Sequence, residues 1–452
     1  MNRVAAATLV ALLAIGAGTG AQAQDARIIT YPEAIQIALE NNVDLRQTRN
    51  AALLSGVNVQ QARNQFLPDL GASAQAGESL GRNFSASEGA TINTDAQFAN
   101  FSVNSGVTLF DGFANTAALK QARLAEKASH LDVQRGRETV VFTVASEYLA
   151  LIQQQEQLRV QRENLAAQTD LLEQVQTYVD AGARTIADLY QQQANVAGAR
   201  LALVQAERAA ELAKVDLIGA LLLDPRGAYE FEPPAAEKIA AAAASDRPAL
   251  PNLMDQAFAQ RADLNAVQQR LSAADQAVRV AKGGYWPTIS LSAGYGTSYN
   301  SANDTAFSDQ LDERRGGSVG VSVSIPIFDR GSVRADTRRA EIAADNARID
   351  LEALHNSVGL QVRRAYLDYR SADEQLSAAD AQQKSATLSL EAVTDRYSAG
   401  AATLVEVSEA RASQVTAASA VVAARYGALF ERTLLDYYVG NLDAAKPAGP
   451  EK

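Results

Sequence analysis

The chain has 452 residues and a formal net charge of −11, which argues against nucleic acid as a partner. It contains no cysteine, so disulfides, thiol catalysis and lipid attachment to an N-terminal cysteine are excluded. Charged residues make up 21% and aromatic residues only 6%, a composition that suits long helices better than a large globular core.

The first residues have the pattern of a secretory signal peptide. Arg3 carries the only early charge, the run from Val4 to Ile15 is apolar, and Ala21-Gln22-Ala23 offers a small-residue cleavage site. We therefore predict that residues 1–23 are a signal peptide and that the mature chain is exported. The apolar run is short for a bilayer span, although an uncleaved anchor is the alternative. No later run of about twenty apolar residues predicts a transmembrane helix.

The rest of the chain is one unit written twice, at residues 24–223 and 252–440. Collinear matches recur at one nearly constant shift, which changes by a single position along the repeat. The matched pairs are Asp44-Leu45 with Asp263-Leu264, Phe66-Leu67-Pro68 with Tyr285-Trp286-Pro287, Phe110-Asp111 with Phe328-Asp329, and Ala181-Gly182 with Ala399-Gly400. The proline-rich segment 224–251 predicts an irregular linker, and the tail 441–452 is expected to be disordered.

Each unit begins with two helices that a proline ends, and then the apolar period changes to two. This alternation predicts strands at about 69–80, 100–110, 287–299 and 316–327, with polar loops at about 81–99 and 300–315. One face is apolar and the other small and polar, which fits a transmembrane barrel with a wet lumen. The alternative is a sandwich strand with one solvated face. Since about eight strands are needed to leave room inside a barrel, four strands predict a barrel shared between chains.

Two long helical hairpins follow the strands. We expect helices at about 112–179, 185–223, 331–397 and 403–438, and a helix of roughly 68 residues is about 100 Å long. In the second unit Val362, Tyr369, Leu390 and Tyr397 keep a seven-residue period beside a row of mostly alanine, which is the pattern of a coiled coil. The first unit has polar residues in that second row, and these predict looser or wetter packing. They are Glu147, Gln154, Gln161 and Gln168.

The duplicated unit, the strand-ending Phe-Asp-Gly and Phe-Asp-Arg-Gly, and the tip sequences at 181–188 and 399–406 resemble the TolC family of outer-membrane efflux proteins. The resemblance covers the mature chain and implies a mainly α fold with a β-barrel portion. It implies a homotrimer whose twelve strands form one barrel in outer-membrane lipid and whose hairpins form a coiled-coil tube through the periplasm. It also implies a periplasmic adaptor and an inner-membrane pump, of RND or ABC type, in efflux or type I secretion.

The resemblance also implies two sets of site residues at the hairpin tips, 180–185 and 398–403. The periplasmic gate falls on Asp188, Tyr397, Glu406 and Glu409, while the family's arginine after the second tip is Ala402 here. Whether Arg184 replaces it is left open. Glu406 and Glu409 are three residues apart, so their carboxylates share a helix face and would form a cation-attracting ring around a symmetric pore. The adaptor-docking tips fall on Ala181, Gly182, Arg184, Thr185, Ala399, Gly400 and Thr403.

No motif in the sequence predicts catalysis. There is no nucleophile elbow and no P-loop, and His130 and His355 lie in predicted helices without ligand-spaced partners. We therefore expect no enzyme activity, no cofactor and no metal site. The main alternative function is an exported coiled-coil scaffold or surface protein without a channel. The sequence leaves open the substrate (drug, metal or polypeptide), the pump and adaptor, and which residues of the strand after Pro68 face lipid.

Overall fold

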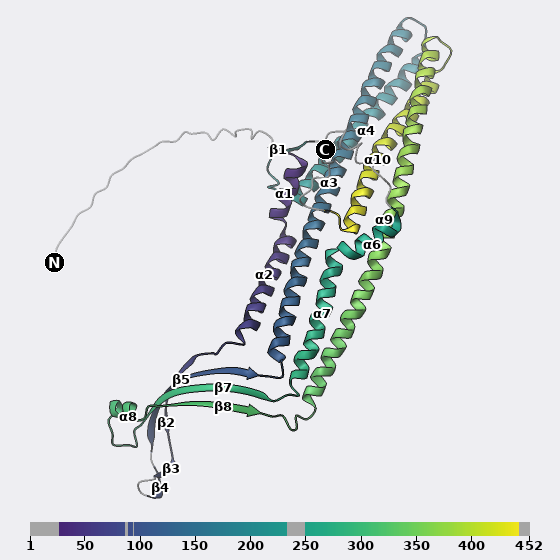
Figure 1. The fold of residues 1–452 in the computed structure, drawn as a ribbon. Coiled ribbons are helices and arrows are strands. Elements are labelled where there is room, and N and C mark those ends of the chain that lie inside the picture. Colours follow the sequence, from purple (N-terminus) through teal and green to yellow (C-terminus); the bar gives the residue numbers. More distant parts are fainter. Residues whose placement is uncertain (1–26, 86–88, 94, 233–248, 443–452) are drawn as a thin grey trace, which may run out of the picture.

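The computed structural model describes residues 27–85, 89–93, 95–232 and 249–442. The predicted signal peptide, most of the linker after Phe231 and nearly all of the predicted disordered tail lie outside these residues. Figure 1 shows a long bundle of helices from whose lower end a curved sheet projects to one side. Within the described residues, no helix is both long and apolar enough to cross a membrane.

The described residues place eight helices in the bundle, and α3 and α9 extend along it from the sheet to the tips (Figure 1). These two have 67 residues each, which corresponds to about 100 Å. Near the tips the helices lie in the order α4, α3, α10, α9, and near the sheet in the order α2, α3, α7, α9. The bounds are α1 (Tyr31–Asn41), α2 (Val43–Asn64), α3 (Ala114–Asp180), α4 (Ile186–Leu221), α6 (Leu250–Gln260), α7 (Ala262–Gly283), α9 (Ser332–Ser398) and α10 (Leu404–Val439).

The long helices are held by seams of buried residues at coiled-coil spacing. In α9 the bulky row includes Val362, Tyr369 and Leu390, and the small row includes Ala365 and Ala379; all five are buried. Alanine in one row allows the backbones of α9 and α10 to approach closely. The larger cores lie at mid-height, where α1 and α6 cover the hairpins, and a third cluster lies at the tips.

The sheet is antiparallel in the order β2, β5, β7, β8, with bounds Gly71–Ser79, Ala96–Phe110, Thr288–Asn300 and Gly316–Ser324. The register keeps the two faces chemically distinct. Leu291 lies opposite Val321 on one face, and Ser290 lies opposite Ser322 on the other. In β2, Ala74 lies opposite Phe101 on the apolar face and Ser73 opposite Ser102 on the polar face. The pleat thus carries the predicted alternation across all four strands.

Several boundaries differ from the sequence prediction. The strand expected at about 316–327 ends at Ser324, because Pro326 cannot donate a ladder hydrogen bond. The strand expected from residue 100 begins at Ala96. The polar loops expected at about 81–99 and 300–315 contain a hairpin of β3 (Arg82–Ser85) and β4 (Ala90–Asn93) and a short helix, α8 (Phe307–Glu313). At mid-height the three-residue strands β1 (Arg27–Ile29) and β6 (Tyr229–Phe231) pair in parallel, so the linker is not wholly irregular.

A buried ionic cluster marks the level where α7 takes over from α10 as the neighbour of α3. Arg261, 3% exposed, donates to both carboxylate oxygens of Asp263, at 3.0 and 2.6 Å, and to Gln361 Oε1 of α9 at 2.9 Å. Arg135 of α3 donates to Glu138 at 2.8 Å and to the Tyr437 carbonyl at the end of α10 at 3.2 Å. The two arginines therefore join α3, α7, α9 and the carboxyl end of α10.

The carboxylates of this cluster differ in their electrostatic environment. Burial opposes the ionisation of Asp263, but the hydrogen bonds and charge of Arg261 outweigh it and hold the pKa of Asp263 below its usual range. At Glu138 burial dominates and raises the pKa, although Arg135 counteracts it. Asp263 is thus the carboxylate whose charge the folded chain stabilises.

We expect Asp263→Asn to destabilise the fold by about 3 kcal/mol, because it leaves the buried Arg261 guanidinium without its counter-charge. The loss is measured as the shift in the unfolding midpoint followed by helical circular dichroism. Asp336→Asn is the matched control, since its ion pair with Arg339 is exposed on both sides and should cost less than about 1 kcal/mol. Equal losses in the two variants would contradict a stabilising role for the cluster.

Candidate functional site

The two hairpin tips have the same backbone structure. Gly182 and Gly400 adopt φ of 72° and 76°, the left-handed conformation that ends α3 and α9. The next amide in each tip donates back to the helix, from Ala183 to Tyr178 at 2.8 Å and from Ala401 to the equivalent residue of α9 at 2.7 Å. A Cβ added at either glycine would meet no atom within 4 Å. Each tip therefore presents bare, exposed backbone at the end of the bundle.

The returning helices begin with capping boxes that use two of the expected gate carboxylates. The Asp188 carboxylate accepts from the Thr185 amide and hydroxyl at 3.1 and 2.8 Å, and Glu406 accepts from the Thr403 amide and hydroxyl, both at 3.1 Å. The Thr403 amide, helped by its hydroxyl, lowers the pKa of Glu406. Glu406 is therefore ionised at neutral pH, and each of the two carboxylates is positioned by its own hairpin.

Arg184 of the first tip contacts Tyr397 of the second hairpin in two ways. Its Nη2 donates to the Tyr397 carbonyl at 3.1 Å, and its guanidinium lies 4.3 Å from the centroid of the Tyr397 ring. Tyr397 is 2% exposed and packs in a cluster with Val175, Leu189 and Leu404. Sequence comparison of the two tips identifies Arg184, but only the structure shows that it reaches the other hairpin.

Ala402, where the TolC family has an arginine, is 6% exposed and belongs to the same apolar cluster. The Ala402 methyl group therefore packs inside the cluster rather than at the tip surface. Within the described residues, the cation beside Tyr397 is supplied by Arg184 from the first hairpin instead.

The hydroxyl of Tyr397 is buried and has no hydrogen-bond partner among the described residues. The resemblance implies a polar network of Tyr397 with Asp188, but no hydrogen bond joins them in the part of the chain that the structure describes. Burial raises the pKa of Tyr397, the Arg184 charge opposes this, and the Asp188 charge adds to it. Asp188 is thus near enough to act through its charge, while its oxygens serve the capping box. The ring and carbonyl of Tyr397, rather than its hydroxyl, connect the hairpins.

The remaining gate candidate, Glu409, is exposed on α10 one turn after Glu406. Glu406 has a second contact, with Arg396 Nη2 at 3.5 Å. A further polar link between the hairpins was not expected from the sequence: Asn195 of α4 donates to Ser408 of α10 at 3.0 Å. The tips therefore place acidic side chains at the amino-terminal end of α10, and two polar contacts join the hairpins there.

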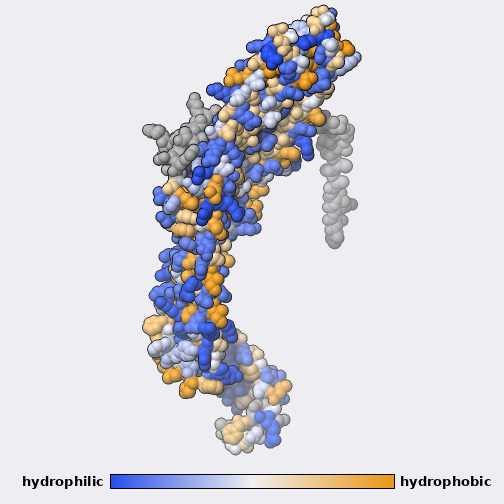
Figure 2. Space-filling model, turned by 90° about the vertical axis from the view of Figure 1, so that its right-hand side faces the viewer, coloured by the Kyte–Doolittle hydropathy of each residue, from blue (hydrophilic) through white to orange (hydrophobic). Residues whose placement is uncertain are grey.

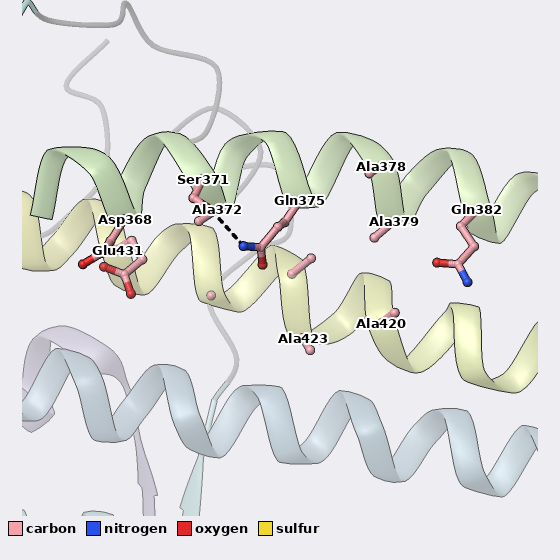
Figure 3. Close-up of a pocket in the computed structure, with 12 residues that line it drawn as sticks. Asp368, Ser371, Ala372, Gln375, Ala378, Ala379, Gln382, Ala420, Ala423 and Glu431 are labelled. Carbon is pink, nitrogen blue, oxygen red and sulfur yellow. Dashed lines mark hydrogen bonds between the residues drawn. The ribbon is translucent and has the colours of Figure 1, made fainter. Parts of the chain in front are cut away.

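A groove of about 560 Å³ lies between α9 and α10 and is shown in Figure 3. Small residues such as Ala372, Ala379 and Ala423 form most of its lining. Asp368 and Glu431 lie close together at one end, and burial, with the Asp368 charge, raises the pKa of Glu431. In the part of the chain that the structure describes, no group of three or more acidic or histidine side chains is placed to hold a metal ion.

Comparison with known proteins agrees with this architecture. The family model described as outer membrane efflux protein matches residues 34–221 and 253–441, which are the two repeats. The outer membrane efflux protein BepC of Brucella suis biovar 1 (strain 1330) is 24% identical over 424 residues, 92% of this chain and 87% of BepC. The outer membrane protein TolC of Escherichia coli (strain K12) is 31% identical over 193 residues, 41% of this chain and 39% of TolC.

The solved structure of the outer membrane protein VceC from Vibrio cholerae superposes with a TM-score of 0.77 at 19% identity, covering 91% of this chain and 96% of VceC. This likeness establishes the fold, a mainly helical chain with the strands of an outer-membrane channel. The expected fold class and resemblance are confirmed, and the alternative of an exported scaffold without a channel finds no support among these relatives. Because the family match spans both repeats, the chain belongs to the outer membrane efflux protein family.

Proposed function

We propose that three copies of this chain form a passive exit duct, with a barrel in the outer membrane and a tube of helical hairpins in the periplasm. The duct catalyses nothing and takes substrate from an inner-membrane pump, of RND or ABC type, through a periplasmic adaptor that docks on the hairpin tips. Efflux and type I secretion both use such a pathway, and the substrate class stays open.

The observation that supports this proposal best is the incomplete sheet. Each edge strand, β2 and β8, has a single neighbour in the four-stranded sheet. Both edge strands are exposed along their whole length, and Val319 and Val321 of β8 are 78% and 63% exposed. In lipid, strands are stable only in a closed barrel, because an open edge leaves backbone groups without hydrogen bonds. Pairing β8 of one copy with β2 of the next satisfies both edges.

The lower end of the bundle carries large exposed side chains that suit a membrane boundary. Trp286, Tyr285 and Phe328 are 58%, 56% and 85% exposed where the helices meet the sheet. Aromatic residues form such belts at the interfaces of outer-membrane barrels. Phe66 and Phe113, at the corresponding ends of α2 and α3, are 44% and 67% exposed. The belt therefore includes both repeats.

The copy number follows from the sheet and the resemblance together. A head-to-tail contact closes into a ring when the rotation between copies fits. Three copies supply twelve strands, above the roughly eight at which a barrel is filled by its own side chains. Twelve strands leave a lumen that the small polar face would line.

Purified protein in a planar bilayer tests the duct directly. We expect an oligomer that conducts ions with a preference for cations, because Glu406 and Glu409 would form an acidic ring at the periplasmic end. Glu406→Gln with Glu409→Gln should weaken that preference and leave assembly intact, since glutamine at Glu406 still completes the capping box. A monomer without conductance would overturn the duct, and an unchanged reversal potential in the double variant would remove these residues from the pore.

We further propose that the Arg184–Tyr397 contact latches the closed end of the tube. It joins the two hairpins of one copy at the tip, and the geometry gives it a charged hydrogen bond and a cation–π contact. A hydrogen bond from a charged donor contributes about 1.5–3 kcal/mol and a cation–π contact about 0.5–2 kcal/mol. Adaptor docking on the bare backbone at Gly182 and Gly400 would thus open the tube by separating the hairpins.

Arg184→Ala should raise the conductance of the closed channel, because both contacts with Tyr397 are lost. Tyr397→Phe should leave conductance unchanged, since the hydroxyl donates to no atom in the described protomer. Single-channel recording at neutral pH distinguishes the two variants. If Tyr397→Phe opened the channel and Arg184→Ala did not, the latch would depend on the hydroxyl and this assignment would be wrong.

Gly182→Ala and Gly400→Ala should abolish efflux while the oligomer still assembles. Alanine has open space at both sites but must adopt a positive φ, which costs about 1–2 kcal/mol and distorts the docking backbone. Gly198→Ala is the control, since it adds the same methyl group in open space on helical backbone. Growth in the presence of an exported toxic compound reports efflux, and normal growth of the two tip variants would contradict docking at these glycines.

A further inference from the structure

The loop between β7 and β8 carries a folded element at the far end of the sheet. Residues 301–315 contain α8, which lies at the end of the sheet farthest from the helical bundle (Figure 1). Gln310 is 1% exposed and holds the loop together. Its Nε2 donates to the carbonyl groups of Asn300 and Thr305 at 3.1 and 2.7 Å, and its Oε1 accepts from the Asn300 amide at 3.0 Å. These bonds keep α8 in one position beside the strand.

The helix α8 packs on the apolar face of the sheet. Thr297 Oγ1 donates to the Leu311 carbonyl at 2.7 Å, and the rings of Tyr299 and Phe307 meet edge to face with their centroids 4.8 Å apart. Alternate residues of a strand point to the same face, so Thr297 and Tyr299 share the apolar face with Leu291. In a barrel with a polar lumen, α8 therefore lies outside the wall and not over the opening.

The spacing of aromatic residues along β7 places α8 at a membrane boundary. Figure 2 shows apolar side chains on the surface where the bundle meets the sheet, and Trp286 is exposed at that level. Tyr295, nine residues later and on the apolar face, is 58% exposed. At about 3.4 Å per residue and a tilt of about 40°, nine residues rise about 23 Å, close to the roughly 25 Å apolar band of an outer-membrane barrel. Tyr299 lies four residues farther, so α8 beside it is level with lipid headgroups.

The side chains of α8 are divided in the way that a membrane interface requires. Phe307 is 48% exposed although its ring contacts Tyr299, and Leu311 lies one turn later on the same helix face. The opposite helix face carries the acidic residues Asp309, Asp312 and Glu313. Amphipathic helices with this division lie in the plane of the interface, with the apolar side toward the acyl chains and the charged side toward water.

Two arginines directly follow α8. Arg314 and Arg315 are both exposed, and Arg315 pairs with Asp312 at 2.9 Å. Both partners of this pair are largely exposed, so it is weak and easily exchanged. Guanidinium groups bind phosphate oxygens with paired hydrogen bonds. The end of α8 therefore offers two cations to phosphate groups at headgroup level.

We propose that α8 is an external anchor that contacts lipid of the outer leaflet, with the Phe307 ring at the boundary of the acyl chains and Arg314 and Arg315 at headgroup phosphates. The inference rests on the proposed function, which places the sheet in the outer membrane, and it names the partner of one loop. The mouth of the duct is then free of this loop.

Fluorescence quenching by labelled lipid tests the anchor, because the chain has a single tryptophan, Trp286. The vesicles contain phosphatidylethanolamine and phosphatidylglycerol, with a nitroxide either on the headgroup or at the middle of an acyl chain. Trp286→Phe with Phe307→Trp should lose about half of its fluorescence to the headgroup nitroxide and less to the chain-middle nitroxide. Trp286→Phe with Ser298→Trp is the control. Ser298 pairs with Asn100 on the polar face, so its replacement should respond to acrylamide in water and resist both lipid probes.

The native tryptophan separates failure of the anchor from failure of the duct. Trp286 of the unmodified protein should be quenched by the headgroup nitroxide, and if it is not, the sheet is outside the membrane and both proposals fail. If Trp286 is quenched but Phe307→Trp behaves like Ser298→Trp, only the anchor is overturned. Tyr299→Trp in the same background gives the same readout if Phe307→Trp does not assemble.

Lipid charge tests the two arginines separately. Brominated phosphatidylglycerol should quench Phe307→Trp about twofold more than brominated phosphatidylcholine, because its headgroup has no positive charge to compete with the guanidinium groups. Arg314→Gln with Arg315→Gln should remove that difference. Equal quenching by the two lipids before the arginines are replaced would overturn their role at headgroup phosphates.

Discussion

The structure depends on backbone hydrogen bonds that a single copy cannot make. Four strands form a sheet with two open edges, and its apolar face needs lipid while its polar face needs water. The arrangement of the helices above the sheet is consistent with that requirement. The open edge of β2 lies on the side of α2 and α4, and the open edge of β8 on the side of α9, so the open edges of the sheet and the outermost helices of the bundle lie on the same two sides. One rotation between copies can therefore satisfy both layers.

The internal repeat explains why the two halves of this long molecule have matching elements of matching length. Each unit contributes two strands, a short helix pair and one hairpin, and α3 and α9 are the two members that pass unbroken from sheet to tip. Their neighbours change at mid-height, where α2 and α7 replace α4 and α10. A change of partner leaves helix ends, with their unpaired carbonyl groups, in the middle of the bundle. Arg135 and Arg261 donate hydrogen bonds to carbonyl groups at the carboxyl end of α10.

Periodicity made the elements predictable from the sequence, because a seven-residue or two-residue period reports burial directly along the chain. The predictions that failed concern contacts between segments that are distant in the sequence. The polar row of α3 was expected to pack more loosely or with water. Glu147, Gln154 and Gln161 are half-buried, but Gln168 is only 9% exposed and accepts a hydrogen bond from Gln192 of α4 at 2.7 Å. The paired strands β1 and β6 have three residues each, too few to show a period. The sequence identified Arg184 as a candidate, but its contact with Tyr397 depends on how the two hairpins lie beside each other, which no local pattern encodes.

The distribution of hydrogen bonds at the tips indicates how they would move. Asp188 and Glu406 are bound within their own capping boxes, so each hairpin end is rigid by itself. Near the tips the described links between the hairpins are fewer: the Arg184–Tyr397 contact, the Asn195–Ser408 hydrogen bond and the apolar cluster around Tyr397. Separating two rigid hairpins breaks this small set, whereas unravelling a tip would also break both caps. The unpartnered Tyr397 hydroxyl lowers the cost further, because a buried hydroxyl without a partner gains hydrogen bonds to water when the hairpins part.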